Sequence, residues 1–95
     1  MEMQVDFDRT GNRFVTLTGG MESSLLFSKG HKGEMVLSYT FVPPSLRGRG
    51  IAGELVHAAA MHARKEGLKI IPACSYTRVY FERHPEFRDI LAGNG

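Results

Sequence analysis

The residues best suited to chemistry in this chain lie in a loop of glycines and arginines. Residues 47–52 read Arg-Gly-Arg-Gly-Ile-Ala, after two prolines and before an alanine-rich run. Glycines let the backbone approach a ligand, and the first N–H groups of a helix lack partners and carry partial positive charge. Arg47 and Arg49 add guanidinium groups that can bind phosphate bidentately. The pattern predicts an anion site at a helix N-terminus, although it also fits a solvated turn that binds nothing.

The surrounding pattern predicts a strand before this loop and a long helix after it. Residues 34–42 are β-prone and end at Pro43 and Pro44, which cannot donate to a sheet. We expect Met35, Leu37, Tyr39 and Phe41 on one face of this strand, with both of its faces partly covered. The alanine-rich residues 51–66 predict a helix with small residues on its buried stripe, closed by Gly67.

The remaining segments complete a small mixed sheet. Residues 22–28 pair with 34–42 as a hairpin, and residues 4–7 and 14–17 are predicted as two edge strands. Residues 68–71 form a strand parallel to 34–42, because a helical crossover joins the two. Residues 76–83 are predicted as a short helix with Ser75 as N-cap, followed by a packed turn around Phe87 and Ile90. The expected fold class is α+β, with a mixed, mostly antiparallel sheet and one long helix in a strand-helix-strand unit.

Residues 47–52, read as Arg-x-x-Gly-x-Ala, resemble the pyrophosphate loop of the GNAT superfamily of N-acetyltransferases. The resemblance extends over residues 13–91 and includes the second strand, at the sequence Ile-Ile-Pro-Ala-Cys of residues 70–74. Among the members of the superfamily, the chain most resembles the small, truncated single-domain ones. It implies an acetyl-CoA-dependent N-acetyltransferase whose cosubstrate, acetyl-CoA, lies between two splayed strands, with an amine as acceptor. It further implies two groups of cofactor-binding residues. The pyrophosphate would lie on Arg47, Gly48, Arg49, Gly50, Ile51 and Ala52, and the amide arm would pair with Phe41 and Val42.

Two further residues are candidates for catalysis. Cys74 follows a strand and precedes a helix, where a helix dipole favours the thiolate, so it is either an acetyl acceptor or a small packing residue. The resemblance places a proton-donating tyrosine in a Phe-Tyr-Glu-Lys-like run. Here Phe81 stands at the tyrosine's usual position and Tyr80 one residue earlier, about 100° around the helix. Tyr80 is therefore either the acid or a packing residue, and Tyr76 is a possible substitute.

The histidines and Glu34 carry weaker signals. His57 and His62 are five residues apart, which is not the spacing of a helical metal pair, so we expect no metal. His31 fits a solvated turn, and His84 fits a proton relay, a cap or a surface residue. Glu34 would serve as a base only if its strand led it into the cleft.

Composition limits the function classes. The 95 residues allow one domain, 1–95, with 1–3 and 92–95 expected to fray. A net charge of +2 with scattered lysines and arginines argues against nucleic acid, and no apolar run suits a membrane. The N-terminus lacks the features of a signal peptide, so we expect a cytoplasmic monomer. The acceptor is a small molecule or a protein. The alternatives are a coenzyme A binding module without catalysis and a small interaction protein.

Overall fold

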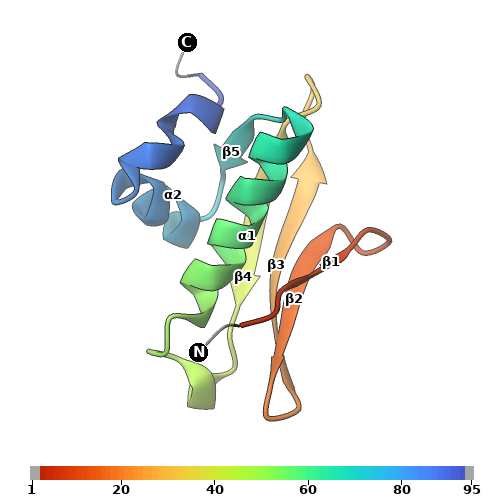
Figure 1. Cartoon of the computed structure of the whole chain (residues 1–95), viewed down its shortest axis with the longest axis vertical. Helices are drawn as coiled ribbons and strands as arrows, with labels where there is room; N and C mark the ends of the chain where they lie inside the picture. The colour runs from red at the N-terminus through yellow and green to blue at the C-terminus, as the bar shows by residue number, and fades with distance from the viewer. Residues whose placement is uncertain (1–2, 94–95) are drawn as a thin grey trace.

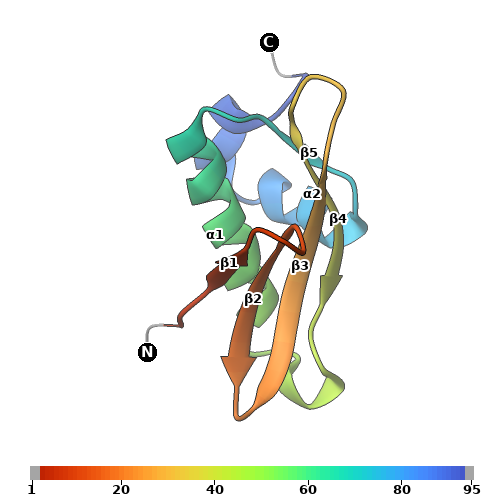
Figure 2. The ribbon, with the colours of Figure 1, turned by 90° about the vertical axis from the view of Figure 1, so that its right-hand side faces the viewer.

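The structure is a computed structural model that describes residues 3–93, and it contains a five-stranded sheet with the helices on one side (Figures 1 and 2). The sheet order follows the chain, β1 to β5, and every neighbouring pair is antiparallel except β4 and β5. The strands are β1 (Asp6–Asp8), β2 (Arg13–Thr18), β3 (Met21–Lys29), β4 (Met35–Phe41) and β5 (Ile70–Pro72). The predicted α+β class, with its mixed and mostly antiparallel sheet, is confirmed.

Helix α1 (Ile51–Glu66) crosses one face of the sheet and connects β4 to β5. Half of its buried side chains are alanines, which let the helix lie close to the strands. The buried residues are Ile51, Leu55, Val56, Ala59, Ala60 and Ala63. Gly67 ends the helix at a φ of 71°, and its N–H donates to the carbonyls of Ala63 and Arg64. The predicted bounds of this helix and its glycine cap are confirmed.

The hairpin of β3 and β4 contains a β-bulge that the alternating pattern did not predict. Leu26 pairs with Tyr39 and Phe27 with Leu37, so Ser38 is the extra residue on β4. Thr40 therefore shares the helix-covered face with Leu37, while Tyr39 turns to the opposite face. The expectation that Met35, Leu37, Tyr39 and Phe41 share one face was wrong, because the extra residue shifts the alternation by one.

Three predictions about the sheet and its caps also need correction. Residues 14–17 do not form an edge strand, because β2 lies between β1 and β3. Strand β5 includes Pro72, which pairs with Leu37, rather than stopping before it. The N-cap of the second helix is Cys74 rather than Ser75, since Ser75 already has helical geometry.

The C-terminal segment packs against α1 and continues the core. Helix α2 (Ser75–Glu82) is followed by a 3₁₀ helix, η2 (Pro85–Ile90), which buries Phe87 and Ile90 as predicted. The termini are less frayed than expected: Met3 packs against the core, and the N–H of Ala92 donates to the Ile70 carbonyl at 2.9 Å. Residues 1–2 and 94–95 of that prediction lie outside the described residues. Within 3–93, no helix has the length and apolarity needed to cross a membrane.

Candidate functional site

The parallel strands β4 and β5 separate just where the candidate site begins. Their pairing ends at Leu37 and Pro72, and the N–H groups of Ala73 and Cys74 both donate to the Leu37 carbonyl, at 3.0 and 3.2 Å. Beyond Leu37, β4 continues to Phe41 without a strand on its β5 side. This stretch of β4, residues 38–41, is called here the free edge. Its backbone groups on that side are available to a ligand.

A groove of about 470 Å³ lies between the free edge and the start of α1. Its walls come from three segments that are separate in sequence: the end of β4, the loop before α1, and the first turn of α2. The lining residues are Tyr39, Thr40, Phe41, Val42, Leu46, Arg47, Gly48, Gly50, Ile51, Ala52 and Tyr76. Seven of the eight residues predicted to bind the cofactor therefore line one groove, and Arg49 is the exception.

The loop into α1 leaves a group of backbone N–H donors without partners. Gly48 and Gly50 have φ values of 83° and 79°, which side-chain-bearing residues adopt only with strain. Gly50 caps the helix, and the N–H of Glu54 donates to its carbonyl at 3.2 Å. The N–H groups of residues 51–53 have no carbonyl partner within the described chain. Together with the helix dipole, these donors favour an anion.

The two arginines of the loop point to different places. Arg47 lines the groove, and its Nε donates to the Val42 carbonyl at 3.0 Å, which ties the loop to the end of β4. Arg49 instead lines a separate hollow of about 720 Å³ with residues of the N-terminal segment and β2, including Asp6 and Leu17. Only Arg47 is therefore positioned beside the groove itself.

Cys74 lies half-buried at the point where β4 and β5 separate. Its Sγ is 3.3 Å from Thr77 Oγ1 and 3.6 Å from Thr40 Oγ1. The Thr77 hydroxyl also lies 2.9 Å from the Cys74 carbonyl, so its single proton can be donated either to that carbonyl or to the sulfur. Burial, the largest single influence, raises the pKa of the thiol, but hydrogen bonds from Thr77, Thr40 and the Tyr76 backbone together hold it below its usual value. The thiol is thus biased toward the nucleophilic thiolate.

The two candidate tyrosines, Tyr76 and Tyr80, lie about one turn apart on α2. Tyr76 borders both the groove and a second hollow of about 410 Å³, whereas Tyr80 borders only the second hollow. Burial, with smaller contributions from Glu86, Tyr76 and Glu54, raises the pKa of Tyr80 to about 12. Burial also raises the pKa of Tyr76. Both phenols therefore keep their protons at neutral pH.

Two other polar residues considered from sequence lie in different surroundings. The imidazole of His84 stacks on Tyr80 with 3.9 Å between ring centroids, and its Nδ1 lies 2.7 Å from the Tyr80 carbonyl oxygen. Glu34 lies in the turn before β4, at the end remote from the groove, where its carboxylate accepts the Lys32 N–H. Glu34 is therefore not a base for chemistry in the groove.

Sequence reasoning did not identify Thr40, Thr77 or Leu46. The two threonines surround the Cys74 sulfur, and Leu46, buried in the short 3₁₀ helix η1 (Pro44–Leu46), lines the groove. Thr77 is three residues after Cys74 at a helix start, a spacing that places the two side chains one turn apart. Thr40 gave no such signal, because its orientation depends on the bulge at Ser38.

Comparison with known proteins gives the family. The model of the family described as GCN5-related N-acetyl-transferase matches residues 13–90. This chain belongs to that family. It is 32% identical to protein NATD1 of Gallus gallus over 87% of this chain and 77% of that protein, and 35% identical to protein NATD1 of Xenopus tropicalis over 87% and 78%.

The fold has a counterpart among solved structures. The solution structure of a GCN5-like protein from Staphylococcus aureus superposes with a TM-score of 0.74, covering 95% of this chain and 88% of that one at 24% identity. At that identity the likeness concerns the fold. The family match and the fold together agree with the predicted GNAT resemblance.

Proposed function

We propose that this protein binds acetyl-CoA in the groove and transfers the acetyl group to an amine. The observation that carries the proposal is the convergence of the free edge of β4 with the unpartnered N–H groups at the start of α1. An anion and an extended amide chain are the two chemical features that such a groove accommodates. Family membership supports the same ligand.

The residues of the groove fit the cosubstrate in two parts. Gly48 and Gly50 carry no Cβ, so the loop can keep its positive φ values and bring its N–H groups and Arg47 to a pyrophosphate. Thr40, Phe41 and Val42 offer main-chain groups to the amides of the pantetheine arm. Arg49 lines a separate hollow that shares only Ile51 with the groove, so it contributes positive charge to this region without lining it.

The chemical step needs an activated acetyl group, a nucleophile and a proton donor. Acetyl-CoA supplies the acetyl group as a thioester. In direct transfer, the neutral amine attacks the acetyl carbon, the carbon–sulfur bond breaks, and a phenol of the protein protonates the departing sulfur. The proton that the nitrogen loses as the amide forms restores the phenol, directly or through solvent. A backbone N–H of the free edge stabilises the negative charge that develops on the carbonyl oxygen.

Cys74 offers a second route for the same overall reaction. Its thiolate attacks the acetyl carbon, the coenzyme sulfur leaves with a proton, and an amine then removes the acetyl group from Cys74. The depressed pKa of the thiol and its position beside the groove residue Thr40 support this route. We propose Tyr80 as the proton donor in either route, with Tyr76 as the second candidate because it borders the groove.

Mass spectrometry tests the proposal in one sample. Native spectra with acetyl-CoA should show a complex, denaturing spectra should show whether an acetyl adduct forms, and an amine panel should release free coenzyme A. An adduct that disappears in Cys74→Ala supports the two-step route, and turnover without an adduct supports direct transfer. A complex without transfer to any amine would overturn the enzymatic proposal and leave a coenzyme A binding protein. The absence of a complex would overturn both.

A further inference from the structure

The sheet face opposite α1 carries exposed apolar side chains. Leu17 is 68% exposed and Tyr39 54% exposed, and Leu26 and Phe41 are also exposed. Leu26 pairs with Tyr39 on one side and with Arg13 on the other. Leu17 lies four residues after Arg13, so it is on the same side of β2. Register therefore places Leu17, Leu26 and Tyr39 on this face. None of the helices described in residues 3–93 covers it (Figure 2). It is called here the open face.

Exposed apolar side chains that are grouped on one face, rather than scattered singly, are typical of an interaction site. The patch extends over β2, β3 and β4, so it is wider than a single small amine would need. It also joins the groove directly, since Tyr39 and Phe41 belong to the open face and line the groove. An acceptor lying on the open face would have its reactive group beside the free edge of β4.

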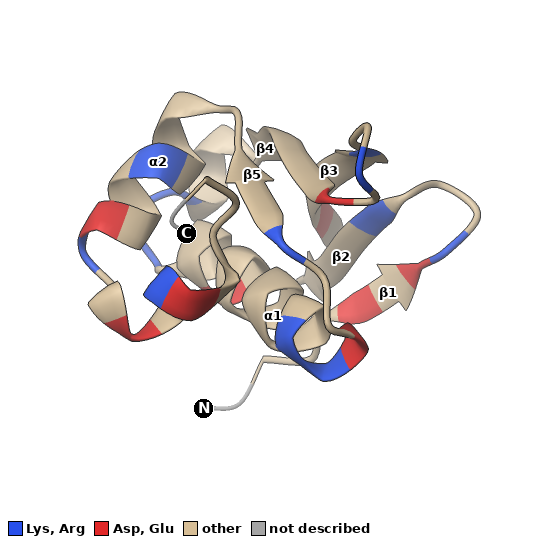
Figure 3. Cartoon of the chain, turned by 90° about the horizontal axis from the view of Figure 1, so that it is seen from above, with Lys and Arg blue, Asp and Glu red and all other residues tan. Residues whose placement is uncertain are grey.

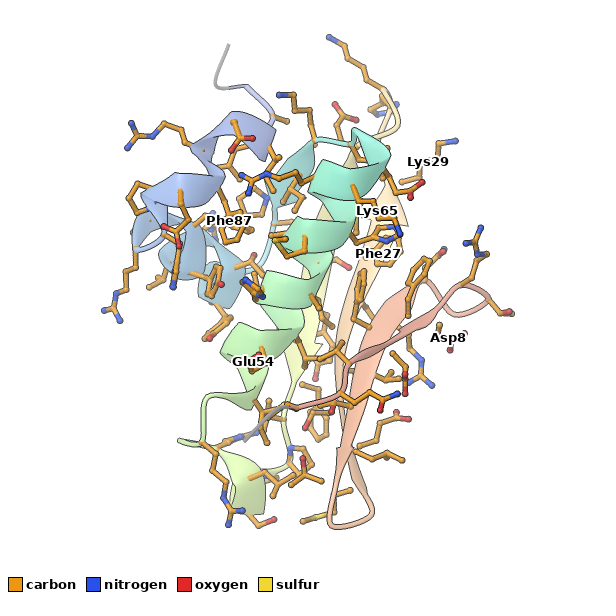
Figure 4. All side chains as sticks on the ribbon, in the orientation of Figure 1. Asp8, Phe27, Lys29, Glu54, Lys65 and Phe87 are labelled. Carbon is orange, nitrogen blue, oxygen red and sulfur yellow. The ribbon has the colours of Figure 1, made fainter. Side chains whose placement is uncertain are left out.

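The charges of the open face are mostly acidic. Strand pairing places Asp6, Asp8, Arg13 and Glu22 on it, which gives three carboxylates against one guanidinium. Arg13 bridges two of them, with Nε 3.0 Å from Asp8 Oδ2 and an Nη 2.8 Å from Glu22 Oε1. Figure 3 shows the two acidic positions of β1 beside the basic position of β2, and Figure 4 shows Asp8 pointing away from α1. These four side chains sum to −2, and Arg49, which shares a hollow with Asp6 and Leu17, reduces the sum to −1, whereas the whole chain carries +2.

We propose that the open face docks the acceptor, and that the acceptor is a basic polypeptide segment with apolar side chains. This inference rests on the proposed function, because it names the class of amine that the groove receives. A lysine side chain is a cationic amine, so the acidic residues attract it and the apolar patch holds the neighbouring side chains of the same segment. A second copy of this chain is a poorer partner, since two open faces packed together carry net charge of the same sign.

Two pairs of variants test the docking surface. Glu22→Lys reverses a charge on the open face, and Glu66→Lys makes the same change in net charge at the exposed C-terminal end of α1. Leu17→Ser removes an exposed apolar side chain from the open face, and Met61→Ser does so on α1, where Met61 is 47% exposed. None of these residues lines the groove.

The probe is a short synthetic peptide carrying lysine and leucine, compared with the same peptide carrying glutamate in place of lysine. We expect the lysine peptide to perturb the NMR signals of β2, β3 and β4. Calorimetry should give binding about fivefold or more weaker for Glu22→Lys and Leu17→Ser, and nearly unchanged for Glu66→Lys and Met61→Ser. Coenzyme A binding should stay the same in all four variants.

Other results would overturn the docking surface. These are equal binding of the two peptides, no binding of either, signal changes confined to the helical side, or dimers in sedimentation that Leu17→Ser dissociates. A wild-type protein that binds coenzyme A but not the lysine peptide refutes the docking surface alone. A wild-type protein that fails to bind coenzyme A refutes the proposed function, whatever the peptide does.

Discussion

At the scale of single residues, the account depends on how Cys74 and Tyr80 hold their protons. Hydrogen bonds from threonine hydroxyls and backbone N–H groups depress the pKa of Cys74 against the effect of burial, and burial raises that of Tyr80. Perturbed pKa values of this kind are typical of acid–base and nucleophilic sites. The sequence identified both residues, but it gave no information about their partners. Thr77 and Tyr76 are close to Cys74 in the sequence, but Thr40 lies on β4, and only the fold brings it to the sulfur.

Removing the threonine hydroxyls should raise the pKa of Cys74. Thr77→Val and Thr40→Val each delete a hydrogen bond that stabilises the thiolate, so the pH midpoint of alkylation by iodoacetamide should move upward in both variants. In the wild type that midpoint should lie below the ordinary value of 9.0. A wild-type midpoint at or above 9.0, or midpoints unmoved by both substitutions, would contradict this account of the thiol.

The shift of Tyr80 should appear in the alkaline stability of the protein. The unfolded chain loses the phenolic proton near pH 10, while the folded protein holds it until about 12. Ionisation of this residue thus favours the unfolded state, and the free energy of unfolding should fall as pH rises through that interval. Tyr80→Phe should remove this part of the decline, measured by urea unfolding from pH 9 to 12. An identical decline of the free energy of unfolding in wild type and variant would refute the raised pKa of Tyr80 as its cause.

The proposed acid role has its own test. Tyr80→Phe should lower kcat about 10²-fold while leaving KM for acetyl-CoA nearly unchanged, because only the transition state loses the proton donor. Tyr76→Phe is the comparison, since it removes the phenol that borders the groove. A large loss in Tyr76→Phe alone would transfer the role to Tyr76, and full activity in both would exclude a phenolic acid.

At the scale of elements, the helix α1 was predictable and the bulge in β4 was not. The bounds of α1 follow from local signals: a glycine loop, an alanine-rich run and a glycine cap at Gly67. The bulge at Ser38 depends on pairing with β3, which a single strand's alternation does not encode. The same reason explains why the prediction of an edge strand at residues 14–17 was wrong. Strand β2 pairs with both β1 and β3, and its own sequence does not encode that pairing. The groove was therefore predictable in its loop and only partly along its strand.

The two ends of α1 give a matched test of the glycine loop. Gly50 and Gly67 both have left-handed φ values, 79° and 71°, and an added Cβ would meet no atom within 4 Å at either. Gly50→Ala and Gly67→Ala should each cost about 1 kcal/mol of stability from backbone strain alone. Only Gly50→Ala should weaken coenzyme A binding in calorimetry, because only Gly50 belongs to the groove. Equal effects of the two on binding would show that the loop has no special role.

At the scale of the whole molecule, the two faces of the sheet differ. Its helical face holds the core, where Phe27 points toward α1 (Figure 4), and its open face remains exposed. Family membership agrees with the predicted resemblance, and the sequence pattern of β2 and β3 did not reveal the open face. That face became visible only once the register showed which residues of four strands share a side.

Two buried hydroxyl groups on the helix-covered face of the sheet, those of Thr16 and Ser23, allow a test of its packing. Thr16 Oγ1 donates to the Gln4 carbonyl at 2.6 Å, whereas the buried hydroxyl of Ser23, its cross-strand neighbour, has no hydrogen-bond partner among residues 3–93. Thr16→Val should lower the free energy of unfolding by about 1 kcal/mol, because a carbonyl loses its donor. Ser23→Ala should leave it unchanged or raise it, since no hydrogen bond is lost. Urea unfolding measures both, and a clear loss of stability in Ser23→Ala would contradict the assignment.

The central claim is that the groove between the free edge of β4 and the start of α1 binds coenzyme A. The most direct measurement is an NMR titration of the isotope-labelled protein with coenzyme A, which reports on every backbone N–H. The account predicts saturable shifts concentrated in residues 39–42 and 47–52 and at Tyr76, with little change in β1 and η2. The absence of saturable shifts, or shifts centred away from this groove, would contradict it.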